Sequence, residues 1–327
     1  MDTVYNVSPS PHVRDNITTQ KIMGAVALAL LPASIAGIIL YGLHALLVLI
    51  VSVASAVLSE YAFEKVTKRP VTVYDLSAVV TGLLIGLNMP PEVPLFMPVL
   101  GSVFGIIVVK QLFGGIGQNF MNPALGARCF LIISFSSQMT DFAAKGGIMG
   151  ASAVDAVSSA TPLAALKTGA SYPLGDLFLG TTLGTIGETS ALALLIGAVF
   201  LLCIKVIDLR IPLSYIGTFF VLVLITALVR GYGMPLYFTV CEVFAGGLML
   251  GAWFMATDYA SSPMTTKGQL IYGVCLGILT FLFRMVSKSN EGVSYAIIFM
   301  NCLTPMIEQF TRPLAFGIKR GKEAKHE

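Results

Sequence analysis

The chain has 327 residues, of which 56% are hydrophobic and only 11% are charged, and its formal net charge is +3. Because soluble domains carry roughly 25% charged residues, this composition excludes a soluble globular protein. The small net charge gives no reason to expect a nucleic-acid partner. Repeated apolar runs near the ~20 residues that cross a bilayer predict a polytopic, lipid-embedded membrane protein.

Cysteine and histidine spacing predicts no metal site in this chain. The 5 cysteines stand singly without a Cys-x-x-Cys pair, and the 3 histidines are isolated. We expect the cysteines to behave as small buried hydrophobic residues. The N-terminal segment is polar and lacks the apolar core of a secretory signal, so the first hydrophobic run is expected to remain as a membrane span.

In chain order, the hydrophobic runs predict ten spans, five on each side of a long polar loop. The spans cover residues 22–41, 43–63, 75–89, 95–113, 119–136, 188–205, 211–229, 236–256, 269–286 and 291–310. The predicted organisation is an N-terminal segment (1–21), a membrane half (22–136), a loop (137–187), a second membrane half (188–310) and a basic tail (311–327).

The lysines and arginines predict that both termini are cytoplasmic. With the N-terminus inside, fourteen of the 20 basic residues lie inside and five outside, and Arg128 falls within a span. The loop 137–187 is then extracytoplasmic. Because each half has an odd number of spans, we expect a 5+5 inverted repeat, in which sites form at interrupted helices. Glycine- and proline-broken stretches of this kind lie at 113–127 and 254–263.

Two carboxylates lie at predicted spans. Glu188 is expected to start the sixth span, where the helix N-terminus favours a negative charge; the alternative is a cation-coupling acid. Glu242 lies inside the eighth span, where an ionisable side chain points to function. An inward-facing structural hydrogen bond explains Glu242 equally well.

The extracytoplasmic loop contains the stretch DAVSSATPL (155–163). Pro162 biases Thr161 towards an extended backbone, and the small residues before Thr161 leave its hydroxyl accessible. Composition alone favours an ordinary loop, with Asp155 as a helix cap.

The same stretch resembles the acceptor motif for covalent flavin. In that motif, a flavin transferase esterifies FMN through its phosphate to the final threonine. The matching residues are Asp155, Ser158, Ala160 and Thr161. Ser159 stands where such families often have glycine, and it does not block access.

The resemblance extends along nearly the whole chain. Five segments, in the right order, resemble the D subunit of the Rnf complex, an ion-pumping ferredoxin:NAD oxidoreductase. They are SPHVRDNITTQKIM (10–23), GGIGQNFMNPALGARCFL (114–131), GETSALALLIGAV (187–199), FMATDYASSPMT (254–265) and YAIIFMNCLTPMI (295–307). The related B subunit of the sodium-pumping NADH:quinone reductase typically has a longer N-terminal extension, so the Rnf member is favoured.

The resemblance implies an electron-carrying subunit of a bacterial inner-membrane translocase. Electrons would reach FMN on Thr161 from a covalent FMN on the G subunit. They would then cross to a non-covalent riboflavin held in this chain, and continue to the NAD-binding C subunit. The A and E membrane subunits and the iron–sulfur B subunit are the other expected partners. A channel or transporter with a 5+5 repeat is the alternative from another class.

Three further polar residues are candidate cofactor contacts. Asn119 and Asn122, in the glycine-rich stretch, offer amide hydrogen bonds to a flavin ring or an ion path; close helix packing at a broken helix is the alternative. Asp258 lies in a stretch that, by resemblance, lines the inner site. A solvated boundary charge or a helix cap would also explain it.

Overall fold

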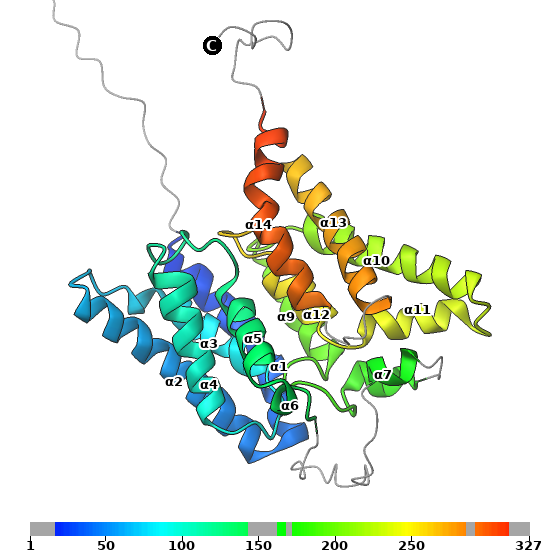
Figure 1. Ribbon diagram of the computed structural model, residues 1–327, viewed down its shortest axis with the longest axis horizontal. Helices are drawn as coiled ribbons and strands as arrows, with labels where there is room; N and C mark the ends of the chain where they lie inside the picture. Colours follow the sequence, from blue (N-terminus) through cyan, green and yellow to red (C-terminus); the bar gives the residue numbers. More distant parts are fainter. Residues whose placement is uncertain (1–16, 143–161, 168–171, 286–291, 314–327) are drawn as a thin grey trace, which may run out of the picture.

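The computed structural model describes residues 17–142, 162–167, 172–285 and 292–313. Every regular element in this part of the chain is a helix, as the all-α prediction requires (Figure 1). Four of the described helices are long and apolar enough to cross a membrane, or up to five if one bent pair counts as a span. Four further apolar helices have 10–17 residues. The predicted total of ten spans stays a prediction.

The first half begins where the Thr18 side chain accepts a hydrogen bond from the Lys21 N–H, which caps the first helix. Gly42, at φ +81°, separates the first two helices in a backbone conformation that glycine adopts without steric cost. The elements are α1 (Thr19–Tyr41), α2 (Leu43–Val66), the 3-10 turn η1 (Val73–Asp75), α3 (Ser77–Leu87), α4 (Phe96–Val103), its π-helical continuation η2 (Phe104–Gln111), α5 (Pro123–Ser134) and α6 (Ser136–Met139).

The rest of the chain has a similar succession of helices. Two short helices of the polar loop are α7 (Pro162–Lys167) and α8 (Leu174–Leu179). The second half contains α9 (Ala191–Cys203), α10 (Arg210–Val229), α11 (Pro235–Phe244), α12 (Leu248–Leu250), its π-helical continuation η4 (Gly251–Met255), α13 (Thr266–Met285) and α14 (Val293–Thr311).

A helix lies at each predicted span, but several boundaries differ. The span predicted from 119 begins only at Pro123, because the Asn122 side chain caps α5 by accepting from the N–H groups of Ala124 and Leu125. Glu188 does not start the sixth span as predicted. Ser190 caps α9 by accepting from the Ala193 N–H, and Glu188 lies in the segment before it.

The predicted span 236–256 is also not continuous. It consists of α11 and α12–η4, which meet at an angle of 63° across residues 245–247. Gly246 has φ +64°, and a Cβ there would lie 2.5 Å from a Leu163 methyl carbon. A Cβ on Gly247 would overlap a Glu188 carboxylate oxygen. The two glycines therefore permit both the bend and the close approach of other segments.

Glycine pairs spaced four residues apart allow helices of each half to pack closely. The pairs are Gly82 and Gly86 in α3, Gly101 and Gly105 in α4–η2, and Gly273 and Gly277 in α13. A Cβ on Gly277 would lie 2.9 Å from the Tyr215 backbone oxygen of α10, and one on Gly82 would lie 3.0 Å from that of Ser52 in α2. Larger residues would force these helices apart.

The two halves pack in a matched way. In the first half α2 packs against α3 and α4, and in the second α10 packs against α11 and α13. The first helices of the two halves, α1 and α9, contact each other, as do the last ones, α5 and α14. The halves therefore meet through corresponding helices.

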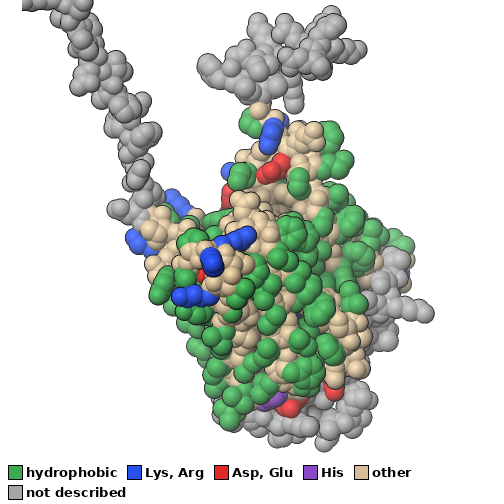
Figure 2. Space-filling model, turned by 60° about the vertical axis from the view of Figure 1, so that its left-hand side comes forward, with side chains coloured by type: hydrophobic (Ala, Val, Ile, Leu, Met, Phe, Trp, Pro, Cys, Tyr) green, Lys and Arg blue, Asp and Glu red, His purple; other side chains and the backbone are tan. Residues whose placement is uncertain are grey.

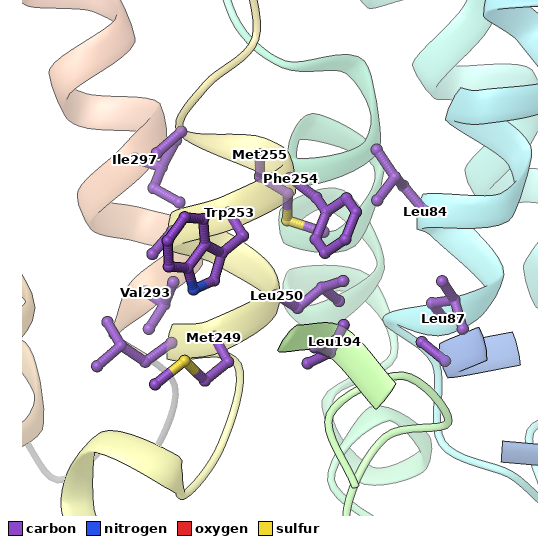
Figure 3. Packing of buried hydrophobic residues seen from close by; sticks show 14 of the residues in the cluster. Leu84, Leu87, Leu194, Met249, Leu250, Trp253, Phe254, Met255, Val293 and Ile297 are labelled. Carbon is purple, nitrogen blue, oxygen red and sulfur yellow. The ribbon is translucent and has the colours of Figure 1, made fainter. Parts of the chain in front are cut away.

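The centre of the core lies around η4, between the two halves (Figure 3). Trp253 and Phe254 of η4 lie among Leu84 of α3, Leu194 of α9 and Ile297 of α14 (Figure 3). The interrupted span thus contributes the side chains that join the halves.

Hydrophobic side chains cover much of the outer surface (Figure 2). Leu58, Ile133 and Val229 are among the large apolar residues left exposed, as a lipid-facing surface requires. Lysines and arginines gather towards the end where the described chain begins and ends (Figure 2). Exposed basic residues of the α1 and α2 ends and of α13 and α14 include Lys21, Lys65, Lys68, Arg69, Lys267 and Arg312.

Candidate functional site

A cavity, here called the loop-side cavity, is lined in part by α7. Figure 1 shows α7 at one end of the molecule. Pro162 and Leu163 form part of its wall, with Leu177 of α8 and Phe244 of α11. Thr161 immediately precedes this wall in the sequence. The cavity combines an apolar lining with charged groups from Arg128, Glu188 and Arg284, as ligand pockets commonly do.

Arg128 and Glu188 form a buried ion pair in this cavity. Arg128 Nη1 lies 2.6 Å from Glu188 Oε1, and the two side chains are 5% and 8% exposed. The same nitrogen donates to Asn88 Oδ1, and Asn88 is anchored by its own donation to the Leu84 carbonyl oxygen over 2.6 Å. The charged pair is therefore fixed between the end of α3, α5 and the segment before α9.

A second arginine in the loop-side cavity binds the backbone at the break in the eighth span. Arg284 of α13 donates to the backbone oxygens of Glu242 and Ala245, over 2.7 and 3.0 Å. Its guanidinium also lies 3.5 Å from the Glu242 carboxylate and over the Phe219 ring. Glu242 is thus a buried carboxylate paired with Arg284.

A second cavity, here called the terminus-side cavity, lies at the opposite end of the helices, near the start of α1. Its apolar wall includes Met23, Leu84, Trp253 and Phe254. Its polar wall includes Asn119, Asn122, Asp258 and Lys110. Two π-helical turns, η2 and η4, contribute to the lining, and such turns are frequent at functional sites.

Three polar residues predicted as cofactor contacts, Asn119, Asn122 and Asp258, line this cavity together. The Asn119 amide nitrogen lies 3.5 Å from Asp258 Oδ2, across a separation of 139 residues in the chain. Asn122 donates to the Met255 backbone oxygen over 3.4 Å. The glycine-rich stretch before α5 and the stretch after η4 therefore face each other across one cavity.

Asp258 is a partly buried acid in this wall. Removal from water raises the pKa of its carboxyl group above the ordinary value, and hydrogen bonds from Ser261, the Ala260 backbone and Asn119 partly oppose the rise. Asp258 is therefore not a fully solvated boundary charge, and its bonds with Ser261 and the Ala260 backbone are local contacts within one turn.

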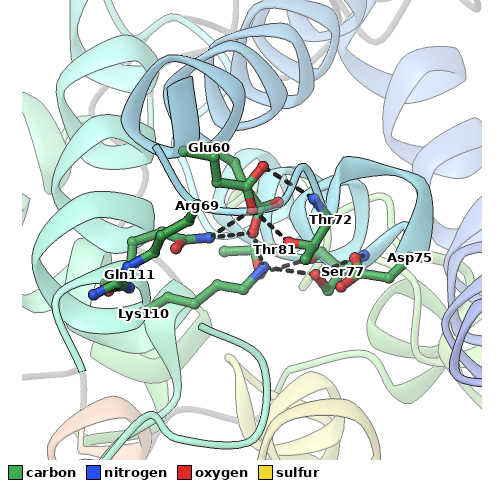
Figure 4. A network of polar contacts seen from close by, with 9 residues as sticks. Glu60, Arg69, Thr72, Asp75, Ser77, Thr81, Lys110 and Gln111 are labelled. Carbon is green, nitrogen blue, oxygen red and sulfur yellow. Dashed lines mark hydrogen bonds and ion pairs between the residues drawn. The ribbon is translucent and has the colours of Figure 1, made fainter. Parts of the chain in front are cut away.

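Lys110 belongs to a buried polar network beside the terminus-side cavity (Figure 4). Its Nζ lies 2.5 Å from Glu60 Oε1 and donates to Ser77 Oγ over 2.6 Å. Gln111 donates to the same Glu60 oxygen over 2.7 Å, and Glu64 accepts from the Thr72 N–H and hydroxyl. The network ties α2, η1, α3 and η2 together (Figure 4).

The predicted flavin-acceptor residues lie outside the described residues. They are Asp155, Ser158, Ala160 and Thr161. The sequence analysis did not select Lys110 or Arg128 as site candidates, although each lines one of the two cavities. Each is a charged residue near or inside an apolar run, and that signal marks an intramembrane site.

The comparisons with known proteins agree along nearly the whole length of the chain. A family model described as the NQR2, RnfD, RnfE family matches residues 6–317. The chain is 46% identical over 326 residues to the D subunit of the Na⁺-translocating ferredoxin:NAD⁺ oxidoreductase complex of Acetobacterium woodii, with 98% of each chain covered. It is 41% identical over 332 residues to the D subunit of the proton-translocating ferredoxin:NAD⁺ oxidoreductase complex of Clostridium ljungdahlii, with 97% of each covered.

A more distant relative is the D subunit of the ion-translocating oxidoreductase complex of Shewanella amazonensis. It is 34% identical over 345 residues, which cover 96% of this chain and 98% of the relative. The matches leave no large part of either chain uncovered. The chain therefore belongs to the NQR2, RnfD, RnfE family.

Proposed function

We propose that this chain is the D subunit of an Rnf-type ferredoxin:NAD oxidoreductase and carries electrons across the bacterial cytoplasmic membrane. In this proposal a flavin transferase attaches FMN to Thr161, and electrons pass from that flavin to riboflavin in the terminus-side cavity. The observation that carries the proposal is the position of the loop-side cavity. Its wall begins at Pro162, next to the proposed acceptor, in a chain 46% identical to a named D subunit.

The residues of the loop-side cavity fit a flavin ring. Leu163, Leu177 and Phe244 offer apolar contact, and two arginines lie beside them. A bound flavin supplies the one-electron chemistry, while the protein fixes its position and electrostatic surroundings. Attachment through Thr161 would keep the cofactor at a site that opens towards the extracytoplasmic loop.

The terminus-side cavity fits a second, non-covalent flavin. Trp253 and Phe254 offer aromatic surface, and Asn119 offers an amide group that suits the polar edge of the ring. The Asn122 amide, which caps α5 and binds the Met255 backbone oxygen, holds the wall of the cavity in place. Asp258, with its raised pKa, is placed to hold a proton at the same wall. The chain's own residues would therefore orient the ring and limit its access to water.

We further propose ten spans in a 5+5 inverted repeat, with both termini cytoplasmic. The matched packing of α2 and α10, each against two later helices of its half, supports the repeat. The contacts between α1 and α9 and between α5 and α14 are those expected for two halves related by a pseudo-twofold axis. The basic residues at the end that holds both described termini support the orientation.

The expected partners are the G, A, E, B and C subunits of such a complex. The G subunit would deliver electrons to the loop side, and the NAD-binding C subunit would receive them on the cytoplasmic side.

Flavin fluorescence of the protein on a denaturing gel tests the proposal. The chain is produced in cells that also make the flavin transferase, and a fluorescent band is expected at its mass. Thr161→Ala should abolish the band, because the ester oxygen is lost. Thr182→Ala, which removes another hydroxyl lining the loop-side cavity, should leave it unchanged. A band that survives Thr161→Ala would overturn the acceptor assignment.

Purification of the intact complex separates this proposal from the neighbouring members of the family. An iron–sulfur subunit and NAD reduction with ferredoxin as donor are expected. Quinone reduction by NADH without ferredoxin would identify a sodium-pumping NADH:quinone reductase instead. A colourless protein that moves solute on its own in liposomes would identify a transporter.

A further inference from the structure

We propose that Arg128 raises the reduction potential of the flavin in the loop-side cavity, and that Glu188 lowers it. This inference rests on the proposed function, because it requires a flavin on Thr161. It concerns two residues whose ion pair the structure places in the wall of that cavity.

Arg128 is held in place by more than its charged partner. Its Nη1 donates to Asn88 Oδ1 as well as to Glu188. The Asn88 amide is itself fixed by donation to the Leu84 carbonyl oxygen. Loss of the Glu188 charge would therefore leave a neutral acceptor that still holds the guanidinium at the cavity.

Glu188 is equally constrained, from the opposite side. Its carboxylate lies against Gly247 at the break between α11 and α12, so closely that a Cβ on Gly247 would overlap a carboxylate oxygen. The side chain is 8% exposed and belongs to the cavity wall. The negative charge of Glu188 is thus held at the wall of the same cavity as the positive charge of Arg128.

Burial makes both charges effective. Charges shielded from water interact more strongly and are less screened by salt than those at the surface. Reduction adds negative charge to a flavin, so a nearby cation favours the reduced form and a nearby anion disfavours it. Removal of Arg128 should therefore lower the potential, and removal of the Glu188 charge should raise it.

Arg284 lies in the same cavity but has a different role. Its guanidinium nitrogens bind two backbone oxygens at the break in the eighth span, and the group stacks on Phe219. A substitution there would disturb the shape of the cavity itself. Arg128 and Glu188 are therefore the pair whose charges can be changed one at a time.

The test is a reductive titration of the full chain with its flavin, followed by absorbance. The redox couple that is present in the parent chain and absent from Thr161→Ala belongs to the loop-side flavin. At fixed potential, Arg128→Gln should lower the ratio of reduced to oxidised flavin about tenfold, which is a shift of about −59 mV for a one-electron couple. Glu188→Gln should shift the couple in the opposite direction. The double variant should lie between the two.

The opposite signs distinguish an electrostatic role from a structural one. Both single substitutions break the same ion pair, so a purely structural effect would move the potential in one direction or not at all. Arg210→Gln is the matched control, because it breaks an exposed pair with Asp208 whose side chains are 47% and 50% exposed. It should leave the potential unchanged.

The failure of this inference can be told from the failure of the proposed function. A chain without fluorescence on the denaturing gel carries no covalent flavin, and the proposed function then fails. A chain that keeps its fluorescence but shows equal potentials, or shifts of the same sign, in the two single variants overturns the role of Arg128 and Glu188 alone. If Arg128→Gln does not fold, the proposal is still tested by two potentials. Glu188→Gln should have a higher reduction potential than the parent chain, and the double variant should have a lower one than Glu188→Gln.

Discussion

Arg284 Nη1 donates to the Glu242 backbone oxygen over 2.7 Å, at the last turn of α11. Its Nη2 donates to the Ala245 oxygen over 3.0 Å. Helix ends leave carbonyl groups without intrahelical partners, and at membrane depth water does not replace them. The Arg284 side chain from α13 thus supplies hydrogen bonds to backbone oxygens that lack intrahelical partners at the 63° bend.

Replacement of Arg284 by alanine should strongly destabilise the protein. We expect the free energy of unfolding to fall by roughly 3–5 kcal/mol, because the substitution removes a buried cation. That cation binds both backbone oxygens and pairs with the Glu242 carboxylate. Unfolding of the purified protein in detergent, followed by circular dichroism, measures the loss. Arg210→Ala, at an exposed ion pair, should cost only about 0–1 kcal/mol. Equal losses in the two variants would contradict the role given to Arg284.

Close packing of α10 and α13 predicts a difference between two helical glycines. A Cβ on Gly277 would lie 2.7 Å from the Thr218 Cβ, whereas a Cβ on Gly217 would meet nothing within 4 Å. Gly277→Ala should therefore lower the thermal midpoint, because the helices must separate. Gly217→Ala should be neutral or slightly stabilising, because alanine favours a helix by about 1 kcal/mol over glycine. A lower midpoint for Gly217→Ala than for Gly277→Ala would contradict this packing.

Much of the fold could be predicted because apolar runs of the right length leave a strong signal. The positions of α1, α2, α10 and α13 follow directly from their hydrophobicity. The break between α11 and α12 could not be predicted in the same way. The backbone oxygen of Ala245 at this break finds its partner in Arg284, which lies 39 residues away in the chain.

The candidate site was predictable only in part. Asn119 and Asn122 were predicted from the amide groups that a glycine-rich stretch offers to a flavin or an ion path, and Asp258 from the family resemblance of its own stretch. The structure brings all three to one cavity. The ion pair of Arg128 with Glu188 spans 60 residues, and no local pattern selects one partner among the available carboxylates. Sequence reasoning placed Glu188 at a helix start, whereas its tertiary partner sets its position.

Asp258 should contribute a pH-dependent component to stability. Its pKa is raised in the folded protein, so the folded state binds the proton more tightly than the unfolded chain. The associated stability is present below the unfolded pKa of about 3.9 and is lost as the pH rises to the folded value. Thermal midpoints of the parent chain measured across that pH range should therefore include a decline due to Asp258, and Asp258→Asn should remove it. Asp208→Asn, at an exposed carboxylate, should retain it.

The buried pair of Glu60 with Lys110 should show strong coupling between its partners. The side chains are 0% and 4% exposed, and Glu60 Oε1 also accepts from Gln111. Lys110→Met leaves the buried Glu60 carboxylate without its cation, which should lower the free energy of unfolding by roughly 3–5 kcal/mol. Glu60→Gln in the same chain restores a neutral acceptor for Gln111, so the double variant should recover most of that loss.

A double-mutant cycle measures this coupling, because the two side chains are in direct contact. Unfolding free energies are needed for the parent chain, Lys110→Met, Glu60→Gln and the double variant, under one set of detergent conditions. A loss in the double variant equal to the sum of the single losses would mean that the two charges do not stabilise each other. Recovery of stability would instead show that the lysine is retained to neutralise Glu60, since a buried ion pair replaced as a unit is often nearly neutral.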